Sequence, residues 1–376
     1  MHAGRAERSR LAVTRLQLTN FRSYGFGEIT VSGAPVVLAG PNGAGKTNVL
    51  DAISLLSPGR GLRGAKLAEH TRKGPVAAEE TLWAVAATVA RGETEYEIGT
   101  GLTQACASRQ VRLNGVAAQS SADLGDIVQL IWLTPAMDRL FTESAGGRRR
   151  FLDRLVLGFE PAHARAATRY ETAMRERARL LKFGPRDPAW LDGLENEMAE
   201  AGIAMAQARA ATVEKLSRAL AERGGAFPAA SLDLTDEIHL SSADVLRTAF
   251  AAGRLRDAEA GRTLTGPHTT DLHVRHTAKR ADARDCSTGE QKALLISIML
   301  ADARELARSR EGLAPILLLD EIAAHLDAER RAALFEEVHA LCAQAWMTGT
   351  DLSLFDSAKA DVFDVRDGVF HPQRAA

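Results

Sequence analysis

Three features that would mark particular protein classes are scarce in this sequence. Only three cysteines occur, Cys106, Cys286 and Cys342, and their spacing suits neither a disulfide framework nor a zinc site. The formal net charge is −1, so no global basic excess points to nucleic acid. No apolar run approaches the roughly 20 residues of a membrane-spanning helix, and the polar start 1–8 lacks the apolar stretch of a secretory signal. We therefore expect a cytoplasmic protein without a membrane segment.

What the chain does contain is a complete glycine-rich motif placed between a predicted strand and a predicted helix. The apolar run 36–39 predicts the strand, and the pattern from Lys46 onward predicts a helix whose N-terminus faces bound phosphates. In such a loop Lys46 reaches the β- and γ-phosphates and Thr47 ligates Mg²⁺. The sequence therefore predicts a nucleoside triphosphate site. The motif G-x-x-x-x-G-K-[ST] is formed by Gly40, Pro41, Asn42, Gly43, Ala44, Gly45, Lys46 and Thr47.

The periodicity of the chain changes twice. Residues 80–118 predict an antiparallel β-lobe that ends at the hairpin signal Asn114-Gly115. Helical periodicity dominates from 148 to about 223, with an apolar stripe that indicates a packed helical hairpin rather than a long coiled coil. The α/β pattern returns after 265. At 376 residues we expect an α/β domain in two parts, 1–145 and 265–376, interrupted by a compact helical lobe, 146–264. The stripe comprises Leu191, Leu194, Met198, Ala201, Met205, Ala208, Leu216 and Leu220.

Two carboxylates follow a second apolar run. Asp320 and Glu321 come directly after 316–319, a short run typical of a strand buried on both faces. The carboxyl ends of such strands border the crevice in which open α/β sheets bind ligands. Asp320 would hold the hydration shell of Mg²⁺, and Glu321 would act as the general base for an attacking water. An acidic turn after a buried strand is the alternative.

A third motif lies between these two and precedes a predicted helix. A serine and a glycine at a helix start offer a hydroxyl and free N–H groups to an anion. A plain helix cap is the alternative interpretation. The motif consists of Ser287, Thr288, Gly289, Glu290 and Gln291.

Together these motifs resemble the Walker A, signature and Walker B motifs of ABC-type ATPases. The resemblance implies ATP and Mg²⁺ as cofactors, and a homodimer in which the signature of one protomer covers ATP bound by the other. Residues 324–327 resemble the D-loop, which includes Asp327, and Thr350 stands at the switch position, where most ABC proteins carry a histidine. The hydroxyl of Thr350 offers a weaker contact than an imidazole. Gln129 is the candidate Q-loop glutamine that senses Mg²⁺, and an ordinary surface or strand glutamine is the alternative.

The length of the insertion separates three branches of that superfamily. Transporter ATPases keep a much shorter stretch between Walker A and signature than the one from Lys46 to Ser287, whereas SMC heads insert hundreds of coiled-coil residues. The chain resembles the RecF family of bacterial recombination-repair ATPases, which implies an SMC-head-like α/β fold with an antiparallel β-lobe, an inserted helical lobe and no long coiled coil. Asp51 and Thr269 depart from the family, which commonly has glutamate and arginine there. The matching segments are 16–24, 42–48, 57–63, 148–153, 266–272 and the signature.

Membership of this family would imply a function in DNA repair and recombination. RecF proteins bind ATP, dimerise, associate with duplex DNA and single-strand/duplex junctions, and work with RecO and RecR to load RecA. The resemblance implies slow ATP hydrolysis as a switch and association with the nucleoid. The alternatives are an SMC-like DNA-bridging ATPase and, more distantly, a transporter ATPase.

Two further sets of arginines are assigned provisional roles. Arg63 lies close to the phosphate loop in sequence and could contact phosphate or ribose, although an exposed loop arginine is an equal alternative. The candidates for DNA contacts are a cluster at the start of the helical lobe, which should touch the backbone without sequence preference. Clusters of this kind often only solvate a helix face. The cluster is Arg148, Arg149, Arg150 and Arg154, and further candidates on the next predicted helix are Arg175, Arg177 and Arg179.

Overall fold

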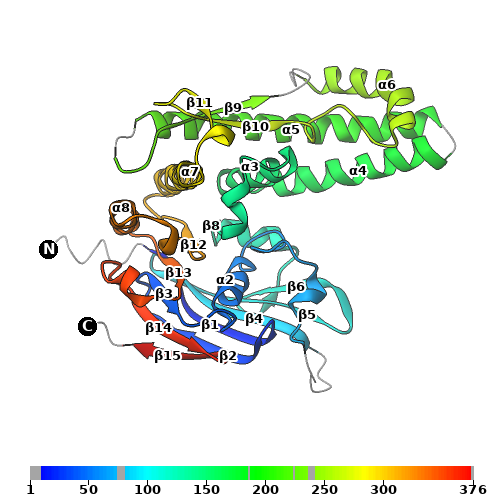
Figure 1. The fold of residues 1–376 in the computed structure, drawn as a ribbon. Helices are drawn as coiled ribbons and strands as arrows, with labels where there is room; N and C mark the ends of the chain where they lie inside the picture. Colours follow the sequence, from blue (N-terminus) through cyan, green and yellow to red (C-terminus); the bar gives the residue numbers. More distant parts are fainter. Residues whose placement is uncertain (1–9, 74–80, 185–186, 223–224, 236–241, 374–376) are drawn as a thin grey trace. The chain divides into compact units, whose positions relative to one another are not determined.

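The computed structural model describes residues 10–73, 81–184, 187–222, 225–235 and 242–373 (Figure 1). The start 1–8, considered above for a signal, lies outside these ranges. The chain divides into two compact units. Unit 1 comprises Met1–Asp138, Gly224–Phe227 and Leu295–Ala376, and unit 2 comprises Arg139–Arg223 and Pro228–Leu294. None of the described helices is both long enough and apolar enough to span a membrane.

Unit 1 contains a sheet of six strands in the order β15-β14-β3-β13-β12-β8. All neighbours in it run parallel except β15, which pairs antiparallel with β14. Every residue of β3, β12 and β13 is buried, as expected for central strands of a parallel sheet. The carboxyl ends of these strands therefore meet at one edge. The strands are β3 (Val36–Ala39), β8 (Leu130–Leu133), β12 (Ile316–Leu319), β13 (Ala345–Gly349), β14 (Asp361–Arg366) and β15 (Val369–Gln373).

A second sheet of unit 1 is antiparallel, in the order β2-β1-β4-β5-β6-β7. Strands β4 to β7 confirm the predicted β-lobe, and Asn114 and Gly115 adopt the positive φ angles of 49° and 79° that a tight two-residue hairpin turn requires. The sheet is larger than the predicted lobe because β1 pairs with β4. The strands are β1 (Leu11–Phe21), β2 (Tyr24–Thr30), β4 (Thr81–Arg91), β5 (Thr94–Thr103), β6 (Cys106–Leu113) and β7 (Val116–Ala117).

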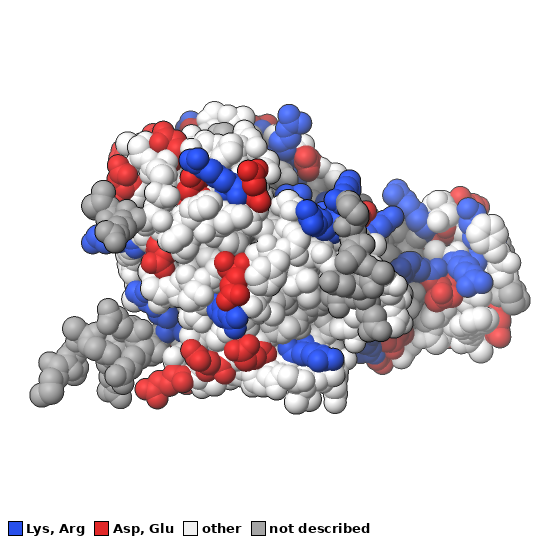
Figure 2. All heavy atoms as spheres, turned by 90° about the horizontal axis from the view of Figure 1, so that it is seen from below, with Lys and Arg blue, Asp and Glu red and all other residues white. Residues whose placement is uncertain are grey.

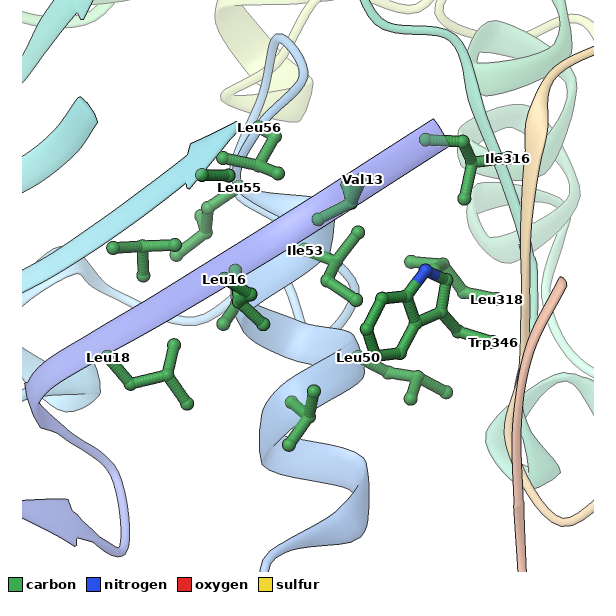
Figure 3. Close-up of a cluster of buried hydrophobic side chains, with 14 of the residues drawn as sticks. Val13, Leu16, Leu18, Leu50, Ile53, Leu55, Leu56, Ile316, Leu318 and Trp346 are labelled. Atoms are coloured by element: carbon green, nitrogen blue, oxygen red, sulfur yellow. The ribbon is translucent and has the colours of Figure 1, made fainter. Parts of the chain in front are cut away.

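Helix α2 (Lys46–Ser54) begins at the phosphate-loop lysine and is anchored in the main core of unit 1. Figure 3 shows Leu50 and Ile53 of this helix among side chains of β1, β12 and β13, including Leu16 and Trp346. Each fully buried aliphatic side chain contributes about 1.5–3 kcal/mol relative to its exposed state. The packing therefore fixes the helix that presents its N-terminus to the nucleotide loop.

In the part of unit 2 that the structure describes, four long helices and the start of a fifth accompany a three-stranded sheet. Helix α5 packs against α4, α6 and β9, and α4 and α5 lie side by side along their length (Figure 1). The predicted apolar stripe is buried at Leu191, Met198, Met205, Leu216 and Leu220, which confirms the helical hairpin. The elements are α3 (Ala145–Phe159), α4 (His163–Phe183), α5 (Pro188–Ala221), α6 (Ala243–Ala260), β9 (Ala230–Thr235), β10 (Asp271–His276) and β11 (Ala281–Asp282).

Unit 2 extends further along the chain than the predicted lobe 146–264. Strand β10 pairs with β9, with Leu272 opposite Leu234, and also contacts α3, so residues beyond 264 belong with the helices. The boundary falls within α7 (Thr288–Ser309), and the signature segment therefore belongs to unit 2. The remaining elements are α8 (Ala328–Ala340) and the short 3₁₀ helices Leu67–His70, Ser121–Asp126, Pro135–Arg139, Ala283–Asp285, Ala323–His325 and Leu352–Phe355.

Candidate nucleotide site and signature segment

The phosphate loop ends in a glycine that no other residue could replace without strain. Gly45 has a φ of +106°, and a Cβ atom there would meet Tyr24 Oη at 2.8 Å and Ser23 Oγ at 2.9 Å. Gly45 is also the N-cap of α2 and supplies no side-chain cap. Because the first N–H groups of a helix have no partner within it, those of α2 are left to hydrogen-bond an anion.

Lys46 is held over the loop by two carbonyl groups. Its Nζ donates to the backbone oxygens of Gly40 at 2.6 Å and Pro41 at 2.9 Å, and the residue is only 5 % exposed. Burial lowers the pKa of the Lys46 ammonium, while the carboxylates of Glu321 and Asp320 act in the opposite direction. The position of the Lys46 ammonium suits the binding of a negatively charged phosphate.

Asp320 is the centre of a hydroxyl network at the carboxyl edge of the parallel sheet. Its Oδ1 accepts from Thr47 Oγ1 at 2.9 Å and from Thr348 Oγ1 at 2.7 Å. The parallel pairing of Leu319 with Met347 brings Thr348 next to Asp320. Hydroxyl and carboxylate oxygens are the ligands that Mg²⁺ prefers, so Thr47 and Asp320 fit the predicted metal.

Thr348 is the residue of this network that the sequence did not reveal. Its Oγ1 also accepts from the backbone N–H of Glu321 at 2.9 Å, so one threonine contacts both Walker B carboxylate residues. The signal was weak, since Thr348 lies only two residues before Thr350 at the switch position. A threonine in a buried strand is ordinary in sequence terms.

Glu321 has an unusual backbone and faces a cavity. Its φ of +53° lies in the left-handed region, which a non-glycine residue adopts only when its surroundings hold it there. Glu321 lines a cavity of about 370 Å³ together with Arg63, whose Nη2 donates to Asn48 Oδ1 at 3.1 Å. The provisional assignment of Arg63 to this site therefore agrees with its position. The other lining residues are Asn42, Gly43, Gly45, Lys46, Thr47 and Asn48.

The structure contradicts the prediction that Gln129 senses Mg²⁺. Gln129 directly precedes β8, and the register that pairs Leu130 with Ile316 places it at the amino end of the sheet, whereas Asp320 lies at the carboxyl end. Its side chain is buried, and its amide donates to the carbonyl of Gly125 at 2.6 Å. Gln129 is a buried, internally bonded glutamine directly before β8, whereas the alternative interpretation was a surface or strand glutamine.

Asp327 and Thr350 occupy different parts of unit 1. The Asp327 carboxylate accepts from the N–H of Arg330 at 2.8 Å and thereby caps α8. Thr350 is exposed and follows β13 at the carboxyl edge of the sheet, where the pairing of Gly349 with Ala39 places it beside the phosphate loop. Thr350 is thus located where a γ-phosphate contact could form, and this role stays a prediction.

The signature segment of unit 2 forms a compact polar cluster at the start of α7. The hydroxyl and the N–H of Ser287 both donate to Glu290 Oε2, at 3.0 and 3.1 Å. Lys279 forms an ion pair with the same carboxylate. The hydrogen bond from Lys279, followed by those from Ser287, lowers the pKa of Glu290 to about 2. Thr288 and Gly289 begin the helix, and the Gln291 amide donates to the carbonyl of Cys286 at 2.9 Å.

Replacing Lys279 with methionine should return the pKa of Glu290 toward about 4.3, the ordinary value for a glutamate. The reason is that the ion pair is the largest influence on this carboxyl. A pH titration of ¹³C-labelled glutamate carboxyls by NMR measures the change. Arg280→Met is the control, because it removes an adjacent exposed positive charge and leaves the ion pair intact. An unchanged Glu290 titration in the Lys279 variant would contradict the assigned cause.

The arginines predicted to contact DNA have different environments, and Arg177 is excluded because it is fully buried in ion pairs with Glu195 and Asp257. Arg148 forms a bidentate pair with Asp271 at 2.8 and 2.7 Å and donates to the carbonyl of Glu143 at 2.6 Å. Its donors are committed within unit 2, which contradicts a DNA contact by Arg148. Arg149 donates to the carbonyl of Thr270 at 3.0 Å, Arg150 is exposed, and the Arg154 guanidinium lies 5.5 Å from the centre of the Phe151 ring. On the face drawn in Figure 2, basic and acidic residues among the described atoms are interspersed.

The comparisons with known proteins agree with this arrangement. The family model described as the RecF/RecN/SMC N terminal domain matches residues 12–369. The DNA replication and repair protein RecF of Agrobacterium fabrum is 48 % identical over 96 % of this chain and 98 % of its own length. The chain belongs to the RecF family. RecF of Mesorhizobium japonicum is also 48 % identical, over 97 % of this chain and 98 % of its own.

Solved structures support the predicted fold of this RecF-family chain. A structure of RecF with ATP, described as a recombination mediator in the RecFOR pathway, superposes with a TM-score of 0.83 at 21 % identity and covers 100 % of both chains. An Smc head domain from Pyrococcus furiosus gives a TM-score of 0.54 at 18 % identity and covers 96 % of both chains. The α/β fold shared by RecF and SMC-type heads is therefore confirmed.

Proposed function

We propose that this RecF-family chain is a DNA replication and repair ATPase that binds ATP with Mg²⁺ and uses slow hydrolysis as a switch. The observation that carries the proposal is the group at the carboxyl edge of the parallel sheet. There Thr47, Asp320 and Glu321 are joined through hydrogen bonds beside the loop that holds Lys46. The names of the curated relatives supply the biological setting.

Each residue of the site has a role that follows from its position. The N–H groups at the start of α2 and the Lys46 ammonium bind phosphate oxygens. Thr47 and Asp320 hold Mg²⁺, which neutralises charge on the phosphates when bound. Glu321 orients a water and accepts its proton, and the bond from its N–H to Thr348 fixes the backbone from which the carboxylate projects.

The proposal extends to an ATP-dependent homodimer. Ser287 to Gln291 would cover the nucleotide of a second protomer, and Asp327 and Thr350 would complete that composite site as D-loop and switch residues. Because nucleotide shared in this way is bound fully only in the closed dimer, ATP would stabilise the dimer and hydrolysis would release it. On DNA, the dimer would act in the cytoplasm at the nucleoid with RecO and RecR to load RecA at single-strand/duplex junctions.

A DNA-binding comparison tests this function. With ATP and RecR present, we expect binding to gapped duplex to exceed binding to plain duplex or single strands by at least about tenfold, or 1.4 kcal/mol. Fluorescence anisotropy with the three labelled DNAs measures the difference. Lys46→Met is the control, since it removes the phosphate-binding ammonium and should abolish the ATP-dependent part. Equal affinity for all three DNAs, unaffected by RecR, would favour an SMC-like bridging function.

A further inference from the structure

Unit 2 contains a cavity of about 620 Å³ that none of the motifs explains. Four arginines from three helices and a loop line it: Arg149 of α3, Arg175 of α4, Arg256 of α6 and Arg262 of the segment that follows α6. The described residues of its lining include no aspartate or glutamate and no phenylalanine, tyrosine or tryptophan. The cavity is therefore cationic, and His268 supplies the one aromatic ring of its described lining.

Several other arginines of unit 2 have their charge balanced by carboxylates. Arg177, Arg209 and Arg254 each form ion pairs with one or two carboxylates, as Arg148 does with Asp271. By contrast, the structure shows no ion pair for any of the four cavity arginines among the described residues.

The bonds that the cavity arginines do make are to neutral groups. Arg149 donates to the carbonyl of Thr270, and Arg175 donates to the carbonyl of Glu171 at 3.2 Å and the hydroxyl of Thr172 at 3.4 Å. Burial and the nearby charge of Arg209 lower the pKa of Arg149, while Asp271 and Asp153 act in the opposite direction. An anion in the cavity would relieve this uncompensated charge.

One wall of the cavity is a rigid loop. Gly266 has a φ of +130°, and a Cβ atom there would lie 2.4 Å from Tyr170 Oη, so only glycine fits. His268 is fixed at both ring nitrogens, because Nε2 donates to the carbonyl of Thr263 at 2.9 Å and Nδ1 therefore accepts from Tyr170 Oη at 2.7 Å. Burial lowers the pKa of His268, so this ring adds shape rather than charge. The loop thus has a defined form before any ligand arrives.

Two residues of the segment 266–272, which resembles the RecF family, hold neighbouring arginines in place. Its Thr270 carbonyl positions Arg149, and its Asp271 carboxylate holds Arg148 beside it. Thr269, which departs from the family, lines the cavity, and its hydroxyl donates to the carbonyl of Gly266 at 2.8 Å. A threonine in place of an arginine leaves the described lining with four arginines and the hydroxyls of Thr263, Thr265 and Thr269.

We propose that this cavity binds phosphodiester groups of a DNA backbone, at a site separate from the ATP site. The guanidinium fork matches phosphate oxygens in pairs, and four such groups without carboxylate partners suit more than one phosphate. Because the described lining has no phenylalanine, tyrosine or tryptophan and the His268 ring is held at both nitrogens, the contacts go to the DNA backbone and read no sequence. The inference rests on the proposed DNA-binding function and assigns residues to it.

The double variant Arg175→Gln/Arg262→Gln tests the proposal. Two lost phosphate contacts should reduce the slope of log K against log salt by about 2 and weaken duplex binding at 0.15 M salt by at least about tenfold. Fluorescence anisotropy of labelled duplex across a salt series gives both values. Arg179→Gln/Arg218→Gln is the matched control, because both residues are exposed on α4 and α5 and neither lines the cavity. Thermal unfolding verifies that both variants are folded.

The outcomes distinguish an error in the proposed site from an error in the proposed DNA-binding function. If the cavity variant keeps the salt slope and affinity of the control while the unsubstituted protein binds DNA, the site is wrong and the DNA-binding function stands. If the unsubstituted protein binds no DNA, both are wrong. Calorimetry with tripolyphosphate on a Lys46→Met background tests whether the cavity binds free phosphates rather than the phosphates of DNA. If the cavity variant lost only tripolyphosphate binding and kept DNA binding, the DNA occupant would be overturned.

Discussion

Replacing Glu321 with glutamine should reduce the ATPase rate at least about 100-fold while ATP binding persists. General-base catalysis typically contributes 10² to 10⁴ in rate, and an amide cannot accept the proton from water. The substitution should preserve the loop, Lys46 and the Asp320 network, since the hydrogen bonds of Lys46, Thr47 and Asp320 described above do not involve the Glu321 side chain. Phosphate release under saturating ATP measures the rate.

The same variant should accumulate as a dimer with ATP, because the step that releases the second protomer is blocked. Size-exclusion chromatography with light scattering measures the mass with and without ATP. Glu329→Gln is the matched control, an exposed glutamate of α8 in the same unit. A monomer at saturating ATP would refute the composite site, and an undiminished rate would refute Glu321 as the base.

Replacing Arg177 with methionine should destabilise unit 2 by about 3–5 kcal/mol, the usual cost of removing one partner from a buried ion pair. Arg177 is fully buried, and its guanidinium bonds Glu195 at 2.8 Å, Asp257 at 2.6 Å and the carbonyl of Phe250 at 2.7 Å. Methionine fills much of the volume but leaves the Asp257 carboxylate without its cation. Urea unfolding followed by circular dichroism gives the change in the free energy of unfolding.

Arg179→Met provides the control for this measurement. Arg179 lies on the same helix, its side chain is 76 % exposed, and it is 3.9 Å from Glu176. An exposed pair of this kind contributes about 0–1 kcal/mol. Equal stability of the two variants would show that the buried network is not a source of stability.

Local patterns predicted which residues come together at the candidate nucleotide site, because these residues lie in short segments next to strands. The phosphate loop and the Asp320-Glu321 pair each follow a strand directly, and the parallel sheet brings their carboxyl ends together at one edge. Thr348 was missed because its contact depends on the register between β12 and β13. Gln129 was misassigned because it precedes strand β8, whereas a glutamine at the carboxyl edge of the sheet would follow its strand. The apolar residues around Gln129 did not reveal where the strand begins.

The remaining differences between the predictions and the structure come from contacts between distant segments of the chain. Arg148 was predicted to be free for DNA, but Asp271, far along the chain, binds it with both carboxylate oxygens. The pairing of β10 with β9 extended unit 2 past the predicted end of the lobe. A run of charged residues in the sequence shows which arginines are present. Whether an arginine can bind DNA depends on the carboxylates that the fold places beside it.

The left-handed backbone at Glu321 is unfavourable for stability, whereas the glutamate side chain at this position is required for the proposed function. Such a conformation costs about 1–3 kcal/mol for a residue with a side chain, and glycine would adopt it freely. A laboratory selection for heat resistance alone would therefore favour Glu321→Gly and discard the proposed base. Persistence of a glutamate there in the face of that advantage would be a signature of selection for turnover.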